Sequence, residues 1–153
     1  MALPQVFSRE VTDELVARIE KLSPESRALW GKMNVSQMLA HCNVTYEMVY
    51  EPEMHRKPGG IMKWMLRKMV KPKVVGEQPY KQNNPTAPQF IISDQREFSN
   101  EKQRLESYLH KTQELGASWF DGRESHSFGA LNATEWNNMF YKHLDHHLKQ
   151  FGV

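Results

Sequence analysis

The sequence predicts an all-α protein, a four-helix bundle with a long crossover between its second and third helices. Four segments repeat apolar residues every three or four positions, which is the spacing of an amphipathic helix. The segments begin or end at helix-capping residues, and strand signals are weak along the whole chain. Because 153 residues can bury one sizeable core, we expect a single domain over residues 1–153.

The first two helices are predicted from an apolar stripe and from their ends. Residues 8–22 carry one such stripe, and "SPES" breaks the helix after it. The second helix begins at "NVSQ", where Asn34 can cap the start while Gln37 reaches back to it. We expect this helix to continue to Tyr50, because Pro52 ends it.

The connection over residues 51–93 holds six of the eight prolines, so we expect no long regular element in it. Within it, "IMKWMLRKMVK" is amphipathic, with methionines on one side and basic residues on the other. "QFII" is the only strand candidate of the chain, and it is short. A connection of this length lets the second and third helices run parallel.

The third and fourth helices are again predicted from their ends. The third opens at "SDQRE", with Asp94 as the cap, and ends at Gly116, a common residue just after a helix. The fourth starts at "NATE", where Asn132 caps and Glu135 lies three residues on, and it runs to about Gln150.

The composition narrows the class of protein. Hydrophobic residues make up 39% and charged residues 25%, which is typical of a globular protein. No window approaches the roughly 18 consecutive apolar residues of a membrane span, and the first residues do not resemble a signal peptide. The single cysteine, Cys42, excludes an internal disulfide and fits a reducing compartment. We therefore expect a cytoplasmic protein.

Basic residues concentrate in residues 54–76, which hold seven Lys/Arg and no acidic residue. Of the 20 basic residues the rest of the chain keeps 13, against 18 acidic ones, so its net charge is −5. Three interpretations stay open, of which one is a basic rim that attracts an anionic substrate such as a carboxylate-bearing thiol; the other two concern the apolar side. The apolar side of this segment packs over an open end of the bundle, or it contacts a membrane surface or a partner. A nucleic-acid partner is disfavoured, because the net charge is only +2 and no helix-turn-helix is evident.

Histidines mark the candidate site. His143 and His147 stand four residues apart on the apolar face of the last helix, where two neutral imidazoles can bind one divalent metal. Buried histidines hydrogen-bonded to carbonyls are the alternative. A metal needs a third donor, and His41 of the second helix is the best candidate. His126, in a loop, either caps the mouth of the site or only makes loop hydrogen bonds. We expect His55, His110 and His146 at the surface.

Two further chemistries are disfavoured. Cys42 points about 100° away from its neighbour His41, so we expect a packed core thiol rather than a ligand. The sequence between the paired histidines lacks the glutamate of an H-E-x-x-H protease, and Asp145 faces away from both.

"WGKMNVSQMLAHC" and "YKHLDHHLKQ" resemble the DinB/YfiT-like superfamily of metalloenzymes. The likeness covers nearly the full chain, and it is closest to a bacterial branch of unknown function that ends in YKHLDHHLxQFG. The resemblance implies an up-down-down-up four-helix bundle and a divalent metal held by His41, His143 and His147. It also implies that Gln150 orients one of these ligands.

The resemblance further implies a metal-dependent enzyme. Some members are transferases or isomerases that use a low-molecular-weight thiol such as bacillithiol, mycothiol or glutathione, while others have no known activity. Because a metal-bound thiolate needs no general base, we expect a thiol-dependent transferase rather than a hydrolase. Zinc or nickel is the expected metal, a small-molecule thiol the expected partner, and a homodimer the expected assembly. The alternative is a non-enzymatic helical bundle that binds a metal, a partner or a membrane surface through residues 54–76.

Overall fold

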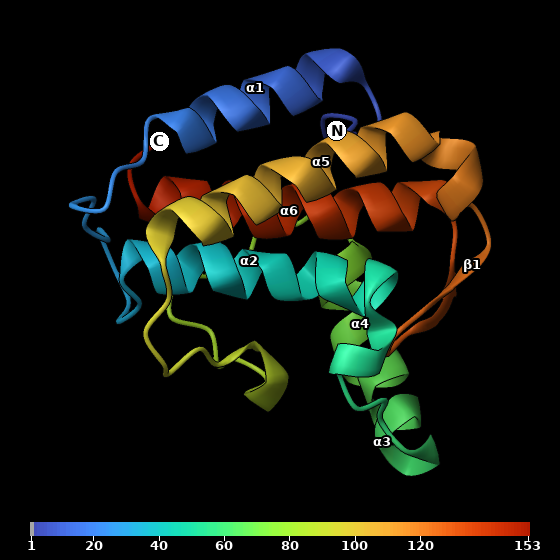
Figure 1. Cartoon of the computed structure of the whole chain (residues 1–153). Helices are drawn as coiled ribbons and strands as arrows, with labels where there is room; N and C mark the ends of the chain where they lie inside the picture. Colours follow the sequence, from blue (N-terminus) through green and yellow to red (C-terminus); the bar gives the residue numbers. More distant parts are fainter. Residues whose placement is uncertain (1) are drawn as a thin grey trace.

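The computed structural model describes residues 2–153, which are predominantly helical, so the expected all-α class is confirmed (Figure 1). Its long helices are α1 (Arg9–Glu20), α2 (Val35–Tyr50), α5 (Phe98–Phe120) and α6 (Ala133–Gln150). These four lie side by side, with α2 against α5 and α6, and α1 covering α5 and α6 from the other side (Figure 1). The two helices that carry the candidate ligands, α2 and α6, are therefore neighbours.

The starts of α2 and α6 are fixed by capping boxes, as the sequence predicted. Asn34 accepts a 2.8 Å bond from the Gln37 N–H, and the Gln37 side chain accepts the Asn34 N–H at 3.1 Å. Asn132 and Glu135 make the same pair of bonds at 2.9 and 3.0 Å. Each cap stabilises its helix by about 1 kcal/mol and fixes where each later residue of the helix points.

Aromatic side chains fill the core beside the first half of α6. Trp136 and Phe140 are each 1% exposed, and their ring centroids lie 5.5 Å apart. Phe140 also stacks on Tyr46 of α2 at 5.0 Å, so α2 and α6 are joined through their aromatic faces. The second half of α6, which carries the histidines, continues along α2 from this anchored contact.

The sequence prediction for α5 was wrong at its start. Glu97, not Asp94, caps this helix, and its carboxylate accepts bonds from N–H groups of the first turn at 3.1 and 2.6 Å. The Asp94 carboxylate instead pairs with Arg96 at 3.0 Å. Gly116, with φ of 74° and ψ of 167°, is not helical, so the helical segment that starts at Phe98 ends there, as predicted. A second, short helical segment of α5 follows and ends at Phe120, which is fully buried.

The strand prediction was also wrong. Only Gln89 and Phe90 of "QFII" belong to a regular element, the 3₁₀ turn η3 (Pro88–Phe90), while an antiparallel hairpin lies elsewhere, in β1 (Arg123–Ser125) and β2 (Gly129–Leu131). Strands of three residues are too short to show an alternating pattern, so no sequence signal predicted them. The turn depends on a glycine, because Gly129 has φ of 77°.

The crossover after α2 consists of η1 (Pro52–Met54) and a bent helix that we call the arm: α3 (Gly60–Met65), η2 (Leu66–Val70) and α4 (Lys71–Val75). The arm projects from the four long helices at the end where α2 finishes (Figure 1). Its middle part, η2, is a π-helix that ends just before Pro72. Because proline offers no N–H and crowds the carbonyl four residues back, a widened turn at this place relieves the clash.

Within residues 2–153, none of the helices combines the length and the hydropathy that crossing a membrane requires.

Candidate metal centre

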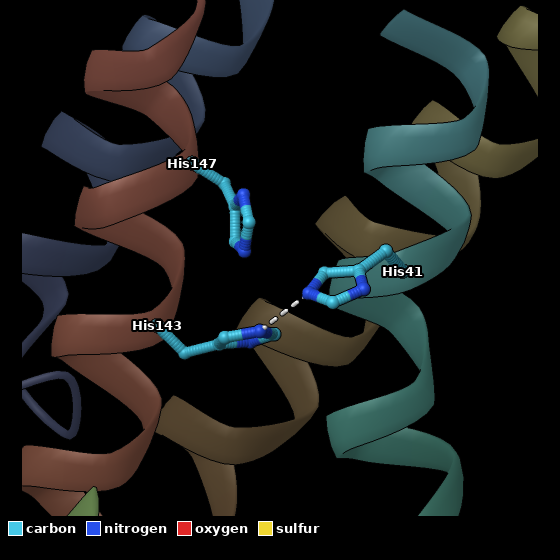
Figure 2. A group of neighbouring side chains, drawn as sticks. All are labelled: His41, His143 and His147. Carbon is cyan, nitrogen blue, oxygen red and sulfur yellow. Dashed lines mark hydrogen bonds between the residues drawn. The ribbon is translucent and has the colours of Figure 1, made fainter. Parts of the chain in front are cut away.

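The structure brings together the three histidines that the sequence singled out. His41 of α2 faces His143 and His147 of α6, and one ring nitrogen of each lies within 4.8 Å of the others (Figure 2). The ring centroids are 4.5 Å apart for His41 and His147, and 4.9 Å for each pair with His143. Among residues 2–153, this is the one group of His, Cys, Asp and Glu close enough to hold a metal ion.

The Nδ1 atom of His41 makes a hydrogen bond within the protein. It lies 2.8 Å from the backbone carbonyl oxygen of Phe90, in the 3₁₀ turn of the crossover. A carbonyl can only accept, so Nδ1 carries the proton and donates it. In a neutral imidazole the other nitrogen, Nε2, then carries a free lone pair. This nitrogen faces the other two histidines (Figure 2).

His147 is fixed in the same tautomer by a chain of two hydrogen bonds. Its Nδ1 lies 2.8 Å from Oε1 of Gln150, one turn further along α6. The Gln150 Nε2 donates to the carbonyl of Trp30 at 2.7 Å, and this second bond orients the amide so that its oxygen faces the ring. His147 therefore donates from Nδ1 and keeps a lone pair on Nε2. The expected contact between Gln150 and a candidate ligand is present.

His143 completes the set through a hydroxyl. Its Nδ1 lies 3.0 Å from Oγ1 of Thr45, a group that can either donate or accept. Its Nε2 lies 2.9 Å from Nε2 of His41 (Figure 2). Because His41 Nε2 carries a lone pair, the proton of this hydrogen bond is on His143 Nε2. If a metal cation replaces that proton, His143 carries its remaining proton on Nδ1 and donates it to Thr45. The Nε2 lone pairs of all three histidines then point toward the cation. The donor set fits a divalent metal.

Burial keeps these imidazoles neutral, the form that binds metals. Removal from water, reinforced by the nearby His41, lowers the pKa of His147 to about 3. The same desolvation, with His147 and His41 as neighbours, lowers the pKa of His143 well below its ordinary value. The pKa of His41 is also lowered by burial, against the opposing effect of its bond to Phe90. No protonated histidine therefore competes with a cation at neutral pH.

Other residues that the sequence considered lie away from the centre. His126 bonds through Nδ1 to Ser127 at 2.9 Å and through Nε2 to the His55 carbonyl at 3.2 Å. Its assignment to the mouth of the site was wrong, and the loop hydrogen-bonding role is correct. Cys42 is fully buried, with its sulfur 3.7 Å from that of Met38, and burial raises the pKa of its thiol. It is the packed core thiol that was expected.

Asp145 faces away from the paired histidines, as predicted, and pairs with Arg18 at 2.9 Å. His110 is exposed, as expected. His55 and His146 are not surface residues. His55 is half-buried and lies 2.7 Å from the Glu47 carboxylate. His146 is also half-buried.

A cleft adjoins the centre across His146, and no pattern in the sequence predicted it. Its volume is about 440 Å³. The His146 ring, which lies 5.1 Å from the His147 ring, forms part of its wall. The other lining side chains include aromatic and basic groups: Trp30, Tyr80, Tyr141, Lys142 and Lys149.

Fold and site together define an all-α protein with a buried three-histidine cluster that can hold a metal ion. Residues 5–152 match the family described as "Protein of unknown function (DUF1569)", and the chain belongs to this family. No curated protein and no solved structure matches the chain.

Proposed function

We propose that His41, His143 and His147 bind one divalent metal ion, zinc or nickel, and that the protein is a metal-dependent enzyme, a thiol-using transferase. The observation that carries the proposal is the direction of the three Nε2 atoms. They converge, while each Nδ1 is bonded to a group of the protein. Such bonds from the outer nitrogen of a histidine are typical of metal ligands.

The proposal includes the DinB/YfiT-like relationship and its up-down-down-up bundle. Four long helices and a long crossover between α2 and α5 support it. So does the contact of Gln150 with His147, which the resemblance to this superfamily implied. In this arrangement α2 supplies one ligand and α6 supplies two.

A bound cation would supply Lewis-acid stabilisation of a thiolate, with at least one coordination position left open by three protein ligands. The protein's own part is to hold the rings. Phe90, Thr45 and Gln150 each fix one imidazole through its Nδ1. Rings fixed in this way do not have to be ordered when the metal and the substrate bind.

Thiol transfer is favoured over hydrolysis by the carboxylates near the two ligand helices. Asp145 is held by Arg18 and Lys149, at 2.9 and 2.7 Å. The buried Glu47 and Glu101 both pair with Arg104, at 2.6 and 3.0 Å. None of these three is available as a general base for water, whereas a thiol that has lost its proton to the solvent needs none.

We place the thiol cosubstrate in the cleft beside His146. The rings of Trp30 and Tyr80 on its wall, each 5.8 Å from the His146 ring, offer apolar area. Lys149 on its rim pairs with Asp145 at 2.7 Å, and it can move to a carboxylate of the thiol because Arg18 continues to hold Asp145. A reducing compartment, the cytoplasm, is part of the proposal, and the single buried thiol of Cys42 supports it.

Elemental mass spectrometry of protein purified without a histidine tag tests the metal. We expect near one ion per chain, falling to background in His143→Ala and in His147→Ala. His110→Ala is the matched control, because His110 is exposed and lies outside the cluster. A metal content that is unchanged in the first two variants contradicts the site. Absence of metal after incubation with zinc, nickel and manganese contradicts it too.

Cobalt-substituted protein tests the thiol separately. Glutathione, bacillithiol and mycothiol are added in turn, and we expect at least one to produce a thiolate-to-cobalt absorption band. Lys149→Gln should weaken the response to thiols that carry a carboxylate. If cobalt binds through the three histidines and no thiol changes its spectrum, the transferase assignment fails while the metal site stands.

A further inference from the structure

The arm, Gly60–Val75, turns its apolar side away from the protein. Ile61 is 82% exposed, Trp64 62% and Met69 65%. Met62, Met65 and Val70 beside them are exposed as well. Ile61, Met65 and Met69 are spaced by four residues, so they follow one another along one side of the helix. Six exposed apolar side chains on one short helix are unusual for a protein surface.

The polar side of the arm is the side that faces the protein. Lys71 pairs with Glu135 of α6 at 2.9 Å, and both side chains are largely covered. Lys63 lies 3.6 Å from Glu124 of β1. The arm is therefore docked with Lys63 and Lys71 toward the protein and its methionines outward, while Lys68 and Lys73 are exposed and Val75 at its end packs against the core. The interpretation in which its apolar side packs over the end of the long helices was wrong.

Hydrogen bonds from α6 to the end of α4 fix this orientation of the arm. Lys142 of α6 donates to the carbonyls of Lys73 and Val74, at 2.8 and 3.2 Å. Asn138, one turn earlier on α6, donates to the carbonyl of Val75 at 2.8 Å. These side chains satisfy the last carbonyls of the helix, which have no partner within it. The apolar side is thus presented by a fixed element.

The arm and the chain just before it carry positive charge without compensation. Five basic residues there make no ion pair within residues 2–153: Arg56, Lys57, Arg67, Lys68 and Lys73. Residues 54–76 contain no acidic residue at all. An exposed apolar strip that includes a tryptophan therefore lies among five basic residues without an ion pair, and the two glutamates that contact the arm are already paired with Lys63 and Lys71. That combination is complementary to a surface that is apolar inside and negatively charged outside.

We propose that the arm binds the surface of an anionic phospholipid membrane. Ile61, Met65 and Met69 enter the boundary between headgroups and acyl chains, and Trp64 lies at headgroup level. Lys68 and Lys73 stay in the headgroup layer and contact phosphates. One short helix gives peripheral, reversible attachment. The proposal does not depend on the metal centre, because the arm contains none of the three ligands.

Sedimentation with vesicles tests the proposal. We use the full chain with vesicles of phosphatidylglycerol and phosphatidylcholine in equal parts, and with pure phosphatidylcholine, at about 50 mM and about 500 mM salt. We expect retention on the anionic vesicles at low salt, and loss of retention at high salt and on the neutral vesicles. Trp64 should show a blue-shifted emission on binding, which Trp64→Ser removes.

Charge and apolar variants separate the two contributions. Lys68→Gln with Lys73→Gln should weaken binding about 25-fold, about fivefold for each lysine. Lys21→Gln with Lys32→Gln makes the same change of charge at exposed sites outside the arm and should leave binding unchanged. Ile61→Ser with Met69→Ser should weaken binding at least about tenfold. These side chains are exposed, so the variants should fold and keep the metal content of the unmodified protein.

Three results overturn the proposal. One is no retention on anionic vesicles at low salt. Another is retention that the arm variants leave unchanged. The third is a concentration-dependent dimer that Trp64→Ser abolishes, since that result assigns the arm to a second copy of the chain.

Discussion

The three-histidine centre and the arm depart from the usual distribution of residues in opposite ways. The centre places titratable groups inside the protein, where burial lowers their pKa values. The arm places apolar groups outside, where they stay in contact with water. Each arrangement costs free energy in the chain taken alone. In the two proposals above, a different ligand offsets each cost: a cation at the centre and an apolar, anionic surface at the arm.

The two regions also differ in how strongly they belong to the fold. The ligand helices are joined by stacked aromatic rings and start at complete capping boxes. The arm contacts α6 through Lys71 and the end of α4, and it contacts β1 through Lys63. Substitutions near the centre should therefore change folding stability, and substitutions on the arm should change binding alone.

Truncating one tryptophan in each region tests this comparison, and it has the largest expected effect on the free energy of unfolding. Trp136→Ala removes a side chain that is 1% exposed, whereas Trp64→Ala removes one that is 62% exposed. We expect the first to lower the free energy of unfolding by about 3–5 kcal/mol. The second should change it by less than about 0.5 kcal/mol. Urea denaturation followed by circular dichroism measures both, and similar losses in the two variants would contradict the comparison.

Metal binding should stabilise the centre and leave the arm unaffected. At a zinc concentration of about 100 times the dissociation constant, the free energy of unfolding should rise by about 2.7 kcal/mol. The rise should vanish in His143→Ala, which removes one of the converging ring nitrogens. It should persist in Trp64→Ala, which lies on the arm. Denaturation with zinc and with a chelator measures it, and an equal rise in His143→Ala would refute the ligand set.

Acid should destabilise the metal-free centre. The pKa of His147 is lowered to about 3 from an ordinary value of 6.5, so the unfolded chain binds this proton first. The stabilising contribution is fully present above about pH 6.5 and is lost progressively as the pH falls toward about 3. Between pH 7 and pH 5 we expect a loss of about 2 kcal/mol from this residue. Denaturation of His147→Gln over the same range should show a correspondingly smaller loss.

Much of the fold was predictable because its signals are local. The capping residues Asn34 and Asn132 lie within four residues of the groups they bond, so the starts of α2 and α6 followed from the sequence. The short helical segment of α5 beyond Gly116 was not predicted. Its position depends on the burial of Phe120, which is a property of the packed core.

The candidate site was predictable in its ligands and not in its supports. The spacing of His143 and His147 on one helix is a local pattern, and Gln150 follows from the same helix. Thr45 lies four residues after His41, and that spacing was a usable signal. The Phe90 carbonyl is 49 residues from His41 and became its partner only through the course of the crossover. The outward turn of the arm was equally hidden, because an amphipathic pattern does not show which side faces the protein.

Gln150 sharpens the comparison by the smallest effect, since it touches the centre without being a candidate ligand. Gln150→Ala removes the acceptor of the His147 proton, and we expect metal affinity to fall at least about tenfold, or about 1.4 kcal/mol. Gln150→Glu keeps an acceptor but loses the bond to Trp30, so it separates support of the ligand from support of the loop. We expect Gln150→Glu to bind metal at least as tightly as the unmodified protein, because a carboxylate accepts more strongly than an amide.

Gln103→Ala on the exposed side of α5 is the control. Competition titrations with a chromogenic chelator measure the affinities, and equal losses in Gln150→Ala and Gln150→Glu would reduce Gln150 to a residue that only ties α6 to the loop before α2.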